Sequence, residues 1–162
     1  MTARMARVVV CGIGNEHRHD DGAGLAVARA LAALRPAVTD AGPLGEPLDL
    51  LGRWDDADLA VVVDAIRSGA APGTVRLEEL ARDNALLDRR SRSAAPSTHG
   101  LGLDDVLCLA RTLGTAPARV VLVGIEGDDF SPGTGLHPDV AAAVARAAAL
   151  VAALLDAALP CA

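Results

Sequence analysis

A pair of adjacent carboxylates, Asp20 and Asp21, offers the clearest chemistry in this chain of 162 residues. They follow a strand-like apolar run and a loop that opens with Gly12 and Gly14, and a helix is predicted to begin beside them. Carboxylates bind divalent cations and act as general bases. They also cap helices, because an aspartate at a helix start accepts a hydrogen bond from a first-turn amide. We expect Asp20 to be the cap, and capping and function remain equally open for Asp21.

The glycine loop invites comparison with the dinucleotide-binding pattern G-x-G-x-x-G. The third glycine of that pattern, which allows a helix to pack closely on a strand, would fall at His17. A histidine cannot replace that glycine. In addition, the two aspartates occupy the helix start, where a pyrophosphate requires free amide donors. The sequence therefore argues against binding of NAD or another nucleotide.

Two further candidate residues lie far downstream. Asp64 ends the apolar run 59–64, where it is either an ordinary strand-terminating residue or a carboxylate held rigidly at a cleft. His99 lies in the segment S-T-H-G-L-G, and a single loop histidine is more often a surface residue than a ligand. Position alone does not decide the role of either residue. The remaining histidines are expected to face solvent: His17, His19 and His137.

Strand-like and helix-like segments alternate along the chain, which predicts an α/β fold with helices on both faces of a sheet. The predicted strands span residues 7–11, 37–40, 59–64, 74–77 and 119–125. The predicted helices span residues 21–34, 45–54, 103–113 and 138–159. Ligand sites in such folds lie beyond the carboxyl ends of the strands. The chain places polar residues there repeatedly, and the stretch 83–100 is predicted to be a long loop over that edge.

Composition limits the class of partner. The net charge of -6 argues against a nucleic-acid backbone, and one tryptophan, one phenylalanine and no tyrosine leave few platforms for base stacking. The three cysteines form no C-x-x-C pair, which is typical of a reduced, cytoplasmic protein. Arg146 and Asp156 interrupt the apolar stretch 140–159, which predicts a buried amphipathic helix rather than a membrane span. We expect one domain over residues 1–162.

Taken together, several short segments resemble the hydrogenase maturation proteases, endopeptidases that trim the C-terminus of the large subunit of nickel–iron hydrogenases. The matching segments keep the family's order over residues 7–150: G-I-G-N with D-D-G-A-G, D-A-G-P-L-G, V-V-V-D-A-I, A-P-G-T, S-T-H-G-L-G-L-D-D-V-L, V-L-V-G-I-E and G-L-H-P-D-V. Two positions depart from the family pattern. The stretch E-H-R-H at 16–19 is usually apolar, and Gly127 replaces a common proline.

The resemblance implies a three-layer sandwich with a mixed, mostly parallel sheet of about five strands. It also implies three residues that contact nickel: an acidic residue at the first helix start, an aspartate at a strand end and a histidine. In this sequence these are Asp21, Asp64 and His99, which would be both the metal-contacting and the catalytic residues. Two carboxylates and one imidazole make an incomplete shell that suits a borderline divalent ion.

The partner that the resemblance implies is the precursor of a hydrogenase large subunit, which already holds nickel in its cysteine cluster. The enzyme would bind that substrate-borne nickel and remove the C-terminal extension. We expect a cytoplasmic monomer that binds neither nucleic acid nor membrane and retains little nickel of its own. The alternative is a non-catalytic maturation scaffold that docks the same precursor.

Overall fold

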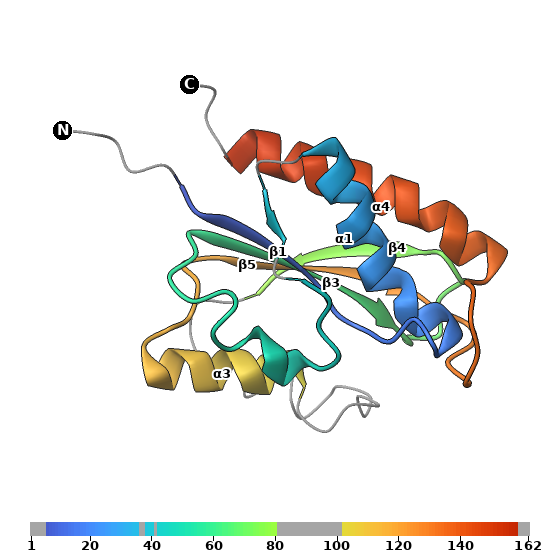
Figure 1. Ribbon diagram of the computed structural model, residues 1–162, viewed down its shortest axis with the longest axis horizontal. Coiled ribbons are helices and arrows are strands. Elements are labelled where there is room, and N and C mark those ends of the chain that lie inside the picture. Colours follow the sequence, from blue (N-terminus) through green and yellow to red (C-terminus); the bar gives the residue numbers. More distant parts are fainter. Residues whose placement is uncertain (1–5, 36–37, 41, 81–101, 159–162) are drawn as a thin grey trace.

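The computed structural model describes residues 6–35, 38–40, 42–80 and 102–158, which form a three-layer α/β sandwich (Figure 1). A five-stranded sheet in the order β2-β1-β3-β5-β4 is the middle layer. Its strands are β1 (Val8–Gly12), β2 (Thr39–Asp40), β3 (Leu59–Ile66), β4 (Val75–Glu79) and β5 (Val120–Glu126). All neighbouring strands are parallel except β4, which pairs antiparallel with β5. The mixed, mostly parallel sheet is confirmed.

Helices cover both faces of the sheet (Figure 1). On one face α1 (Ala23–Leu34) packs against α4 (Pro138–Ala158), and on the other α3 (Leu103–Leu113) packs against the 3-10 helix η2 (Pro47–Leu50). Successive residues of each central strand point into opposite cores. Because both faces are covered, these strands are continuous apolar runs.

The helix α4 is the one described helix that is long and apolar enough to cross a membrane, with a mean hydropathy of 1.9. That test depends on length and composition alone, and the core helix of a soluble protein also passes it. In this fold Ala143, Ala147 and Val151 of α4 are fully buried in the core that it shares with α1 and the sheet. Their spacing is that of an amphipathic helix, in agreement with the prediction for this segment.

Two predicted helices differ from the structure. Within residues 45–54 only the short helix η2 forms, because Pro47 occupies its first position and Gly52 turns the chain with φ +81°. The predicted helix 21–34 begins instead as a 3-10 helix, η1 (His19–Gly22), and continues as α1. All five predicted strands are observed, with bounds that differ by at most two residues at either end. The stretch 83–100 lies outside the described residues.

Candidate active site at the carboxyl edge of the sheet

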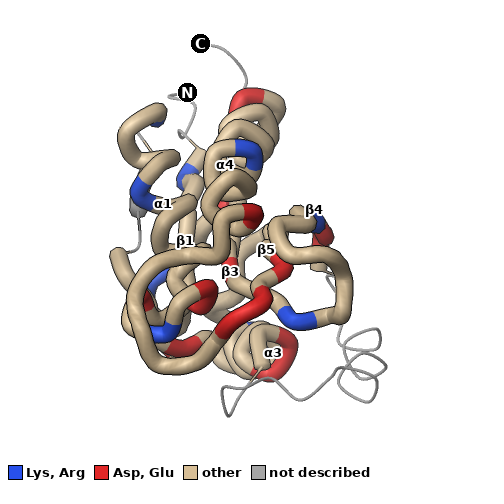
Figure 2. Tube along the Cα trace, turned by 90° about the vertical axis from the view of Figure 1, so that its right-hand side faces the viewer, with Lys and Arg blue, Asp and Glu red and all other residues tan. Residues whose placement is uncertain are grey.

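The carboxyl ends of β1, β3 and β5 meet at one edge of the sheet, because the three strands are parallel. Figure 2 shows acidic residues gathered around this edge, which we call the carboxyl edge. Asp64, on β3, lies opposite Gly124 of β5. The helix η1, which carries Asp20 and Asp21, lies against β3. The fold therefore brings Asp21 and Asp64 to one place from segments that are far apart in the sequence.

A glycine in α1 allows that helix to approach the strands. A Cβ atom on Gly24 would lie 2.4 Å from the carbonyl oxygen of Val63 and 2.5 Å from that of Ile13, distances too short for any side chain. Gly12 is equally constrained, since its Cβ would lie 2.5 Å from the Gly24 carbonyl oxygen. Gly24 thus performs the close-packing role of the third glycine in a dinucleotide loop, farther along the chain. The sequence pattern tests position 17 for this glycine, and only the fold shows that Gly24 fills the role.

Asp21 is held rigidly although it does not cap the helix. The residue is 2% exposed, and its Oδ2 atom accepts a hydrogen bond from the backbone amide of Asn15 at 3.1 Å. Gly14 makes room for this turn, because a Cβ there would lie 1.8 Å from the Asp21 carbonyl oxygen. The loop between β1 and η1 therefore binds the carboxylate of Asp21, which follows it in the sequence.

Asp64 is partly buried, and its Oδ1 atom is a buried oxygen without a hydrogen-bond partner among the described residues. Burial of the carboxylate, reinforced by the negative charge of Asp21, raises the pKa of Asp64 to about 7, and the backbone amide of Ala65 opposes this shift only in part. A buried polar atom without a partner is rare and marks candidate functional positions. A cation bound here would supply the partner that Oδ1 lacks.

Asp20 does not cap the first helix, which corrects the expectation from sequence. Neither η1 nor α1 has a side-chain cap bond. The carboxylate of Asp20 is fully buried and accepts hydrogen bonds from three backbone amides of the segment between β5 and α4, those of Asp128, Asp129 and His137. A cap would bond an amide close in sequence, whereas the donors to Asp20 lie more than a hundred residues downstream.

Glu126, at the end of β5, is a third buried carboxylate, and its role was not predicted. It is 1% exposed and accepts hydrogen bonds from the amides of Ser68 and Gly69 and from the Ser68 hydroxyl. It thereby holds the loop that follows β3. Both Glu126 and Asp64 follow an apolar run, although β3 continues two residues past Asp64, where the sequence predicted its end. The sequence did not distinguish a carboxylate bonded to a loop from one without a described partner.

The third residue of the predicted triad, His99, lies outside the described residues. Among the described residues, no group of three or more His, Cys, Asp and Glu side chains is arranged to hold a metal ion. The structure therefore brings together Asp21 and Asp64 of the predicted site. The histidine stays a prediction from sequence.

Two of the histidines predicted to face solvent are partly buried instead. The ring of His19 packs against Gly133, and its Nδ1 atom lies 3.1 Å from the carbonyl oxygen of Gly135. The Nδ1 atom of His137 accepts a hydrogen bond from the amide of Asp139 in the first turn of α4. Both rings therefore have structural partners at the carboxyl edge, which sequence position did not show. His17 is exposed, as predicted.

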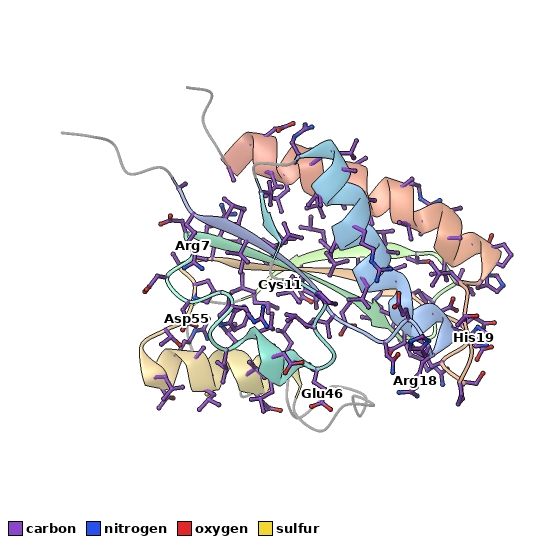
Figure 3. All side chains as sticks on the ribbon, viewed as in Figure 1. Arg7, Cys11, Arg18, His19, Glu46 and Asp55 are labelled. Carbon is purple, nitrogen blue, oxygen red and sulfur yellow. The ribbon has the colours of Figure 1, made fainter. Side chains whose placement is uncertain are left out.

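A hollow of about 520 Å³ lies beside the loop that follows β1. It lies between residues 14–18 and residues 43–46, and its lining includes Asn15, whose amide binds the Asp21 carboxylate. Figure 3 shows Arg18 and Glu46 on the two sides of this region. The volume is within the range of small-ligand pockets, about 300–1,000 Å³. Glu16, His17 and Arg18 of the stretch E-H-R-H therefore form part of the wall of this hollow.

The fold and the site define a class: a three-layer α/β protein with two interacting carboxylates at the carboxyl edge of its sheet. The sequence profile of the hydrogenase maturation proteases matches residues 25–154. The hydrogenase 2 maturation protease of Escherichia coli (strain K12) is 33% identical over 155 residues, which cover 92% of this chain and 90% of that protein. The chain belongs to the hydrogenase maturation protease family.

Solved structures agree with this assignment. The hydrogenase maturating endopeptidase HybD from Escherichia coli superposes with a TM-score of 0.78 at 32% identity, covering 94% of this chain and 93% of that chain. The [NiFe] hydrogenase maturation protease HybD from Thermococcus kodakarensis gives a TM-score of 0.73 at 26% identity, covering 91% and 98%. These similarities confirm the predicted family and fold class.

Proposed function

We propose that this protein is an endopeptidase that removes the C-terminal extension of a nickel-loaded [NiFe] hydrogenase large-subunit precursor. In this proposal Asp21, Asp64 and His99 contact the nickel that the substrate carries. Membership of the family supports maturation proteolysis as the reaction class. The observation that carries the metal contact is the buried Oδ1 atom of Asp64, which has no hydrogen-bond partner in the described chain and lies close enough to Asp21 to feel its charge.

The chemistry of the donors supports a divalent metal on the substrate. Imidazole and carboxylate ligands suit nickel among the borderline ions. Nickel held in the substrate would polarise the scissile carbonyl as a Lewis acid. The chain's own carboxylates would fix the metal-bearing end of the precursor, and one of them would accept a proton from the attacking group as general base. Rigid placement of Asp21 by the Asn15 amide favours such fixing.

The electrostatics of the carboxyl edge point the same way. The Asp21 and Asp64 carboxylates lie close enough at this edge for the charge of Asp21 to raise the pKa of Asp64. Burial strengthens the field of a charge because the surroundings polarise less than water. The edge therefore attracts a cationic centre, which favours a substrate that presents a metal.

Cleavage of the precursor tests the proposed site. Asp21→Ala, Asp64→Ala and His99→Ala would each be assayed with nickel-loaded precursor, and we expect each to abolish shortening of the large subunit. Normal cleavage by all three variants would overturn the proposed site. Glu79→Ala, on β4 and away from the carboxyl edge, is the control for a lost carboxylate. Nickel-free precursor, which we expect to remain uncleaved by the wild-type enzyme, tests the dependence on metal.

A non-catalytic maturation scaffold is the competing function, because the same carboxylates would also serve docking. Purified wild-type protein and nickel-loaded precursor distinguish the two. A shortened large subunit supports the protease, and a stable complex with an intact precursor supports the scaffold. We further propose a cytoplasmic monomer that binds neither membrane nor nucleic acid and keeps little nickel after purification. Stoichiometric retained metal would indicate a resident metal ion instead.

A further inference from the structure

We propose that Asp20 is a positioning residue for this reaction. By tying the segment between β5 and α4 to η1, it fixes the separation of Asp21 from Asp64. The inference rests on the proposed function, since it requires that those two carboxylates act together on the substrate. Asp20 itself touches neither metal nor scissile bond in this proposal.

Both oxygens of the Asp20 carboxylate are engaged. Oδ2 accepts hydrogen bonds from the amides of Asp128 and Asp129 at 2.8 and 3.0 Å, and Oδ1 accepts one from the amide of His137 at 2.7 Å. The backbone amide of Asp20 in turn donates to the carbonyl oxygen of Asp129 at 2.9 Å. All three side-chain bonds are charge-assisted, and the carboxylate is fully buried. One residue therefore fixes both ends of the segment 128–137.

The residues before Asp20 fasten the same two segments. The amide of His19 donates to the carbonyl oxygen of Gly133 at 3.0 Å, and the amide of Gly133 donates to the carbonyl oxygen of His17 at 2.8 Å. Gly133 must lack a side chain here, because a Cβ would lie 2.1 Å from the His19 ring and its φ is +150°. His19 itself adopts the uncommon φ of +47°. The segment 17–20 is thus bonded along its length to the segment 128–137.

This fastening reaches Asp64 through the sheet. Asp64 pairs with Gly124 of β5, and β5 ends two residues later at Glu126. The next residue, Gly127, lies so close to Asp20 that a Cβ on it would be 3.0 Å from the Asp20 Cβ. Asp64 is therefore connected to β5 by strand pairing, and the segment after β5 is connected to Asp20 by hydrogen bonds. Asp21 is the next residue along the chain. A change in the Asp20 bonds would move Asp21 relative to Asp64.

Glu126 provides a comparison that separates positioning from stability. It is also a buried carboxylate with three donors at the carboxyl edge, but those donors lie in the loop after β3 and it is not joined to Asp21. Glu126→Ala and Asp20→Ala therefore remove similar numbers of buried hydrogen bonds. If Asp20 only stabilised the fold, the two variants would lose activity equally once both are folded.

The experiment measures kcat and KM for cleavage of nickel-loaded precursor, together with the unfolding temperature, for Asp20→Ala and Glu126→Ala. Asp20→Asn, which keeps the size of the side chain but places an amide group against backbone N–H donors, is included in case the alanine variant does not fold. Assays are run well below each unfolding temperature. We expect kcat of the Asp20 variants to fall about 100-fold with KM within about twofold, because misplacement by about 1 Å costs that much in catalysis.

The outcomes are distinguishable. A kcat loss confined to the Asp20 variants supports the positioning role. Equal kcat for folded Asp20→Ala and Glu126→Ala, while Asp21→Ala is inactive, overturns the positioning role and leaves the proposed function standing. Full activity of Asp21→Ala overturns the proposed site itself. Loss of activity in both alanine variants in proportion to their unfolding temperatures assigns Asp20 to stability alone.

Discussion

The two ends of the parallel strands hold their carboxylates in opposite ways. At the amino end, Arg119 binds Glu79 through two contacts of 2.9 and 3.2 Å, and the amide of Arg7 donates to Asp58. The Arg119 and Glu79 side chains are 35% and 50% exposed. At the carboxyl edge, Asp20 is fully buried and its carboxylate accepts hydrogen bonds from three backbone amides. The charge of Glu79 is thus paired at the surface, whereas that of Asp20 is bonded to backbone amides inside the protein.

This difference identifies the functional end of the sheet on physical grounds. Exposed ion pairs cost little to form and contribute little, so they need no function to persist. Buried carboxylates are costly to desolvate and persist only where bonding or function offsets that cost. The backbone bonding of Asp20 offsets its burial. The Oδ1 atom of Asp64 has no partner in the described chain, so bonding there does not offset its burial. Binding of a cation would offset it.

Removal of charge from Asp64 should produce the largest difference between the two ends. Asp64→Asn retains the shape of the side chain, and we expect kcat/KM for nickel-loaded precursor to fall by about 10²–10⁴, the usual contribution of a general base or comparable charged group. Glu79→Gln makes the same chemical change at the amino end and should leave cleavage unchanged. Similar losses in both variants would abolish the distinction between the ends.

Stability against pH should show the cost of the Asp64 charge. The pKa of Asp64 is raised in the folded state from an ordinary 3.8 to about 7. A raised pKa means that the folded state prefers the protonated form, so the contribution of this group is most favourable below about pH 4. That contribution is lost as the pH rises through 7. The total loss is on the order of 4 kcal/mol, from about 1.4 kcal/mol per pKa unit.

Urea unfolding of wild-type protein and Asp64→Asn at pH 5 and pH 8 checks this expectation. The variant cannot ionise at this position, so it should be the more stable protein at pH 8, and the advantage should shrink at pH 5. If the variant were more stable than the wild type by the same amount at pH 5 and pH 8, the Asp64 charge would not be the cause. A residue that costs stability where it is ionised but supports cleavage is expected at a functional site rather than at a structural one.

Close packing of α1 on the sheet should be the next most sensitive feature. Gly24→Ala places a Cβ atom 2.4 Å from the Val63 carbonyl oxygen, directly before Asp64, so helix and strand must separate. We expect a loss of about 1–3 kcal/mol in the free energy of unfolding, as for overpacking elsewhere, measured by urea denaturation. Gly45→Ala is the control, since its nearest atom would be 3.7 Å away. An equal effect in both variants would contradict the packing role.

The sequence was sufficient for the sheet and for placing Asp21 and Asp64 at one edge of it, while their role stays a prediction. Long β-branched runs predicted β1, β3 and β5, because a strand covered on both faces must be apolar throughout. Asp64 followed from its place at the end of such a run. Local patterns failed where partners are distant in sequence, as with Asp20, whose acceptor role depends on amides of residues 128–137. No local rule connects those two segments.

Local rules also misjudged residues 45–54 and Glu126. A helix was predicted over 45–54, but Pro47 and Gly52 confine regular structure to one short 3-10 helix. For Glu126, the sequence showed a carboxylate at a strand end and could not show that Ser68 and Gly69 would bond it. Burial and tertiary hydrogen bonds decide which acidic residue has partners, and both appear only when the chain has folded.

The smallest effect is expected at the amino end, where Arg119→Ala removes the paired contact with Glu79. Because both side chains are substantially exposed, the loss in unfolding free energy should be less than about 1 kcal/mol and should diminish at high salt. Cleavage of precursor should stay at the wild-type rate, since the carboxyl edge is untouched. A loss larger than that caused by Gly24→Ala would mean that the exposed pair contributes substantially to the stability of the fold. The contrast between the two ends would then reflect their exposure to solvent alone and not a division between scaffold and site.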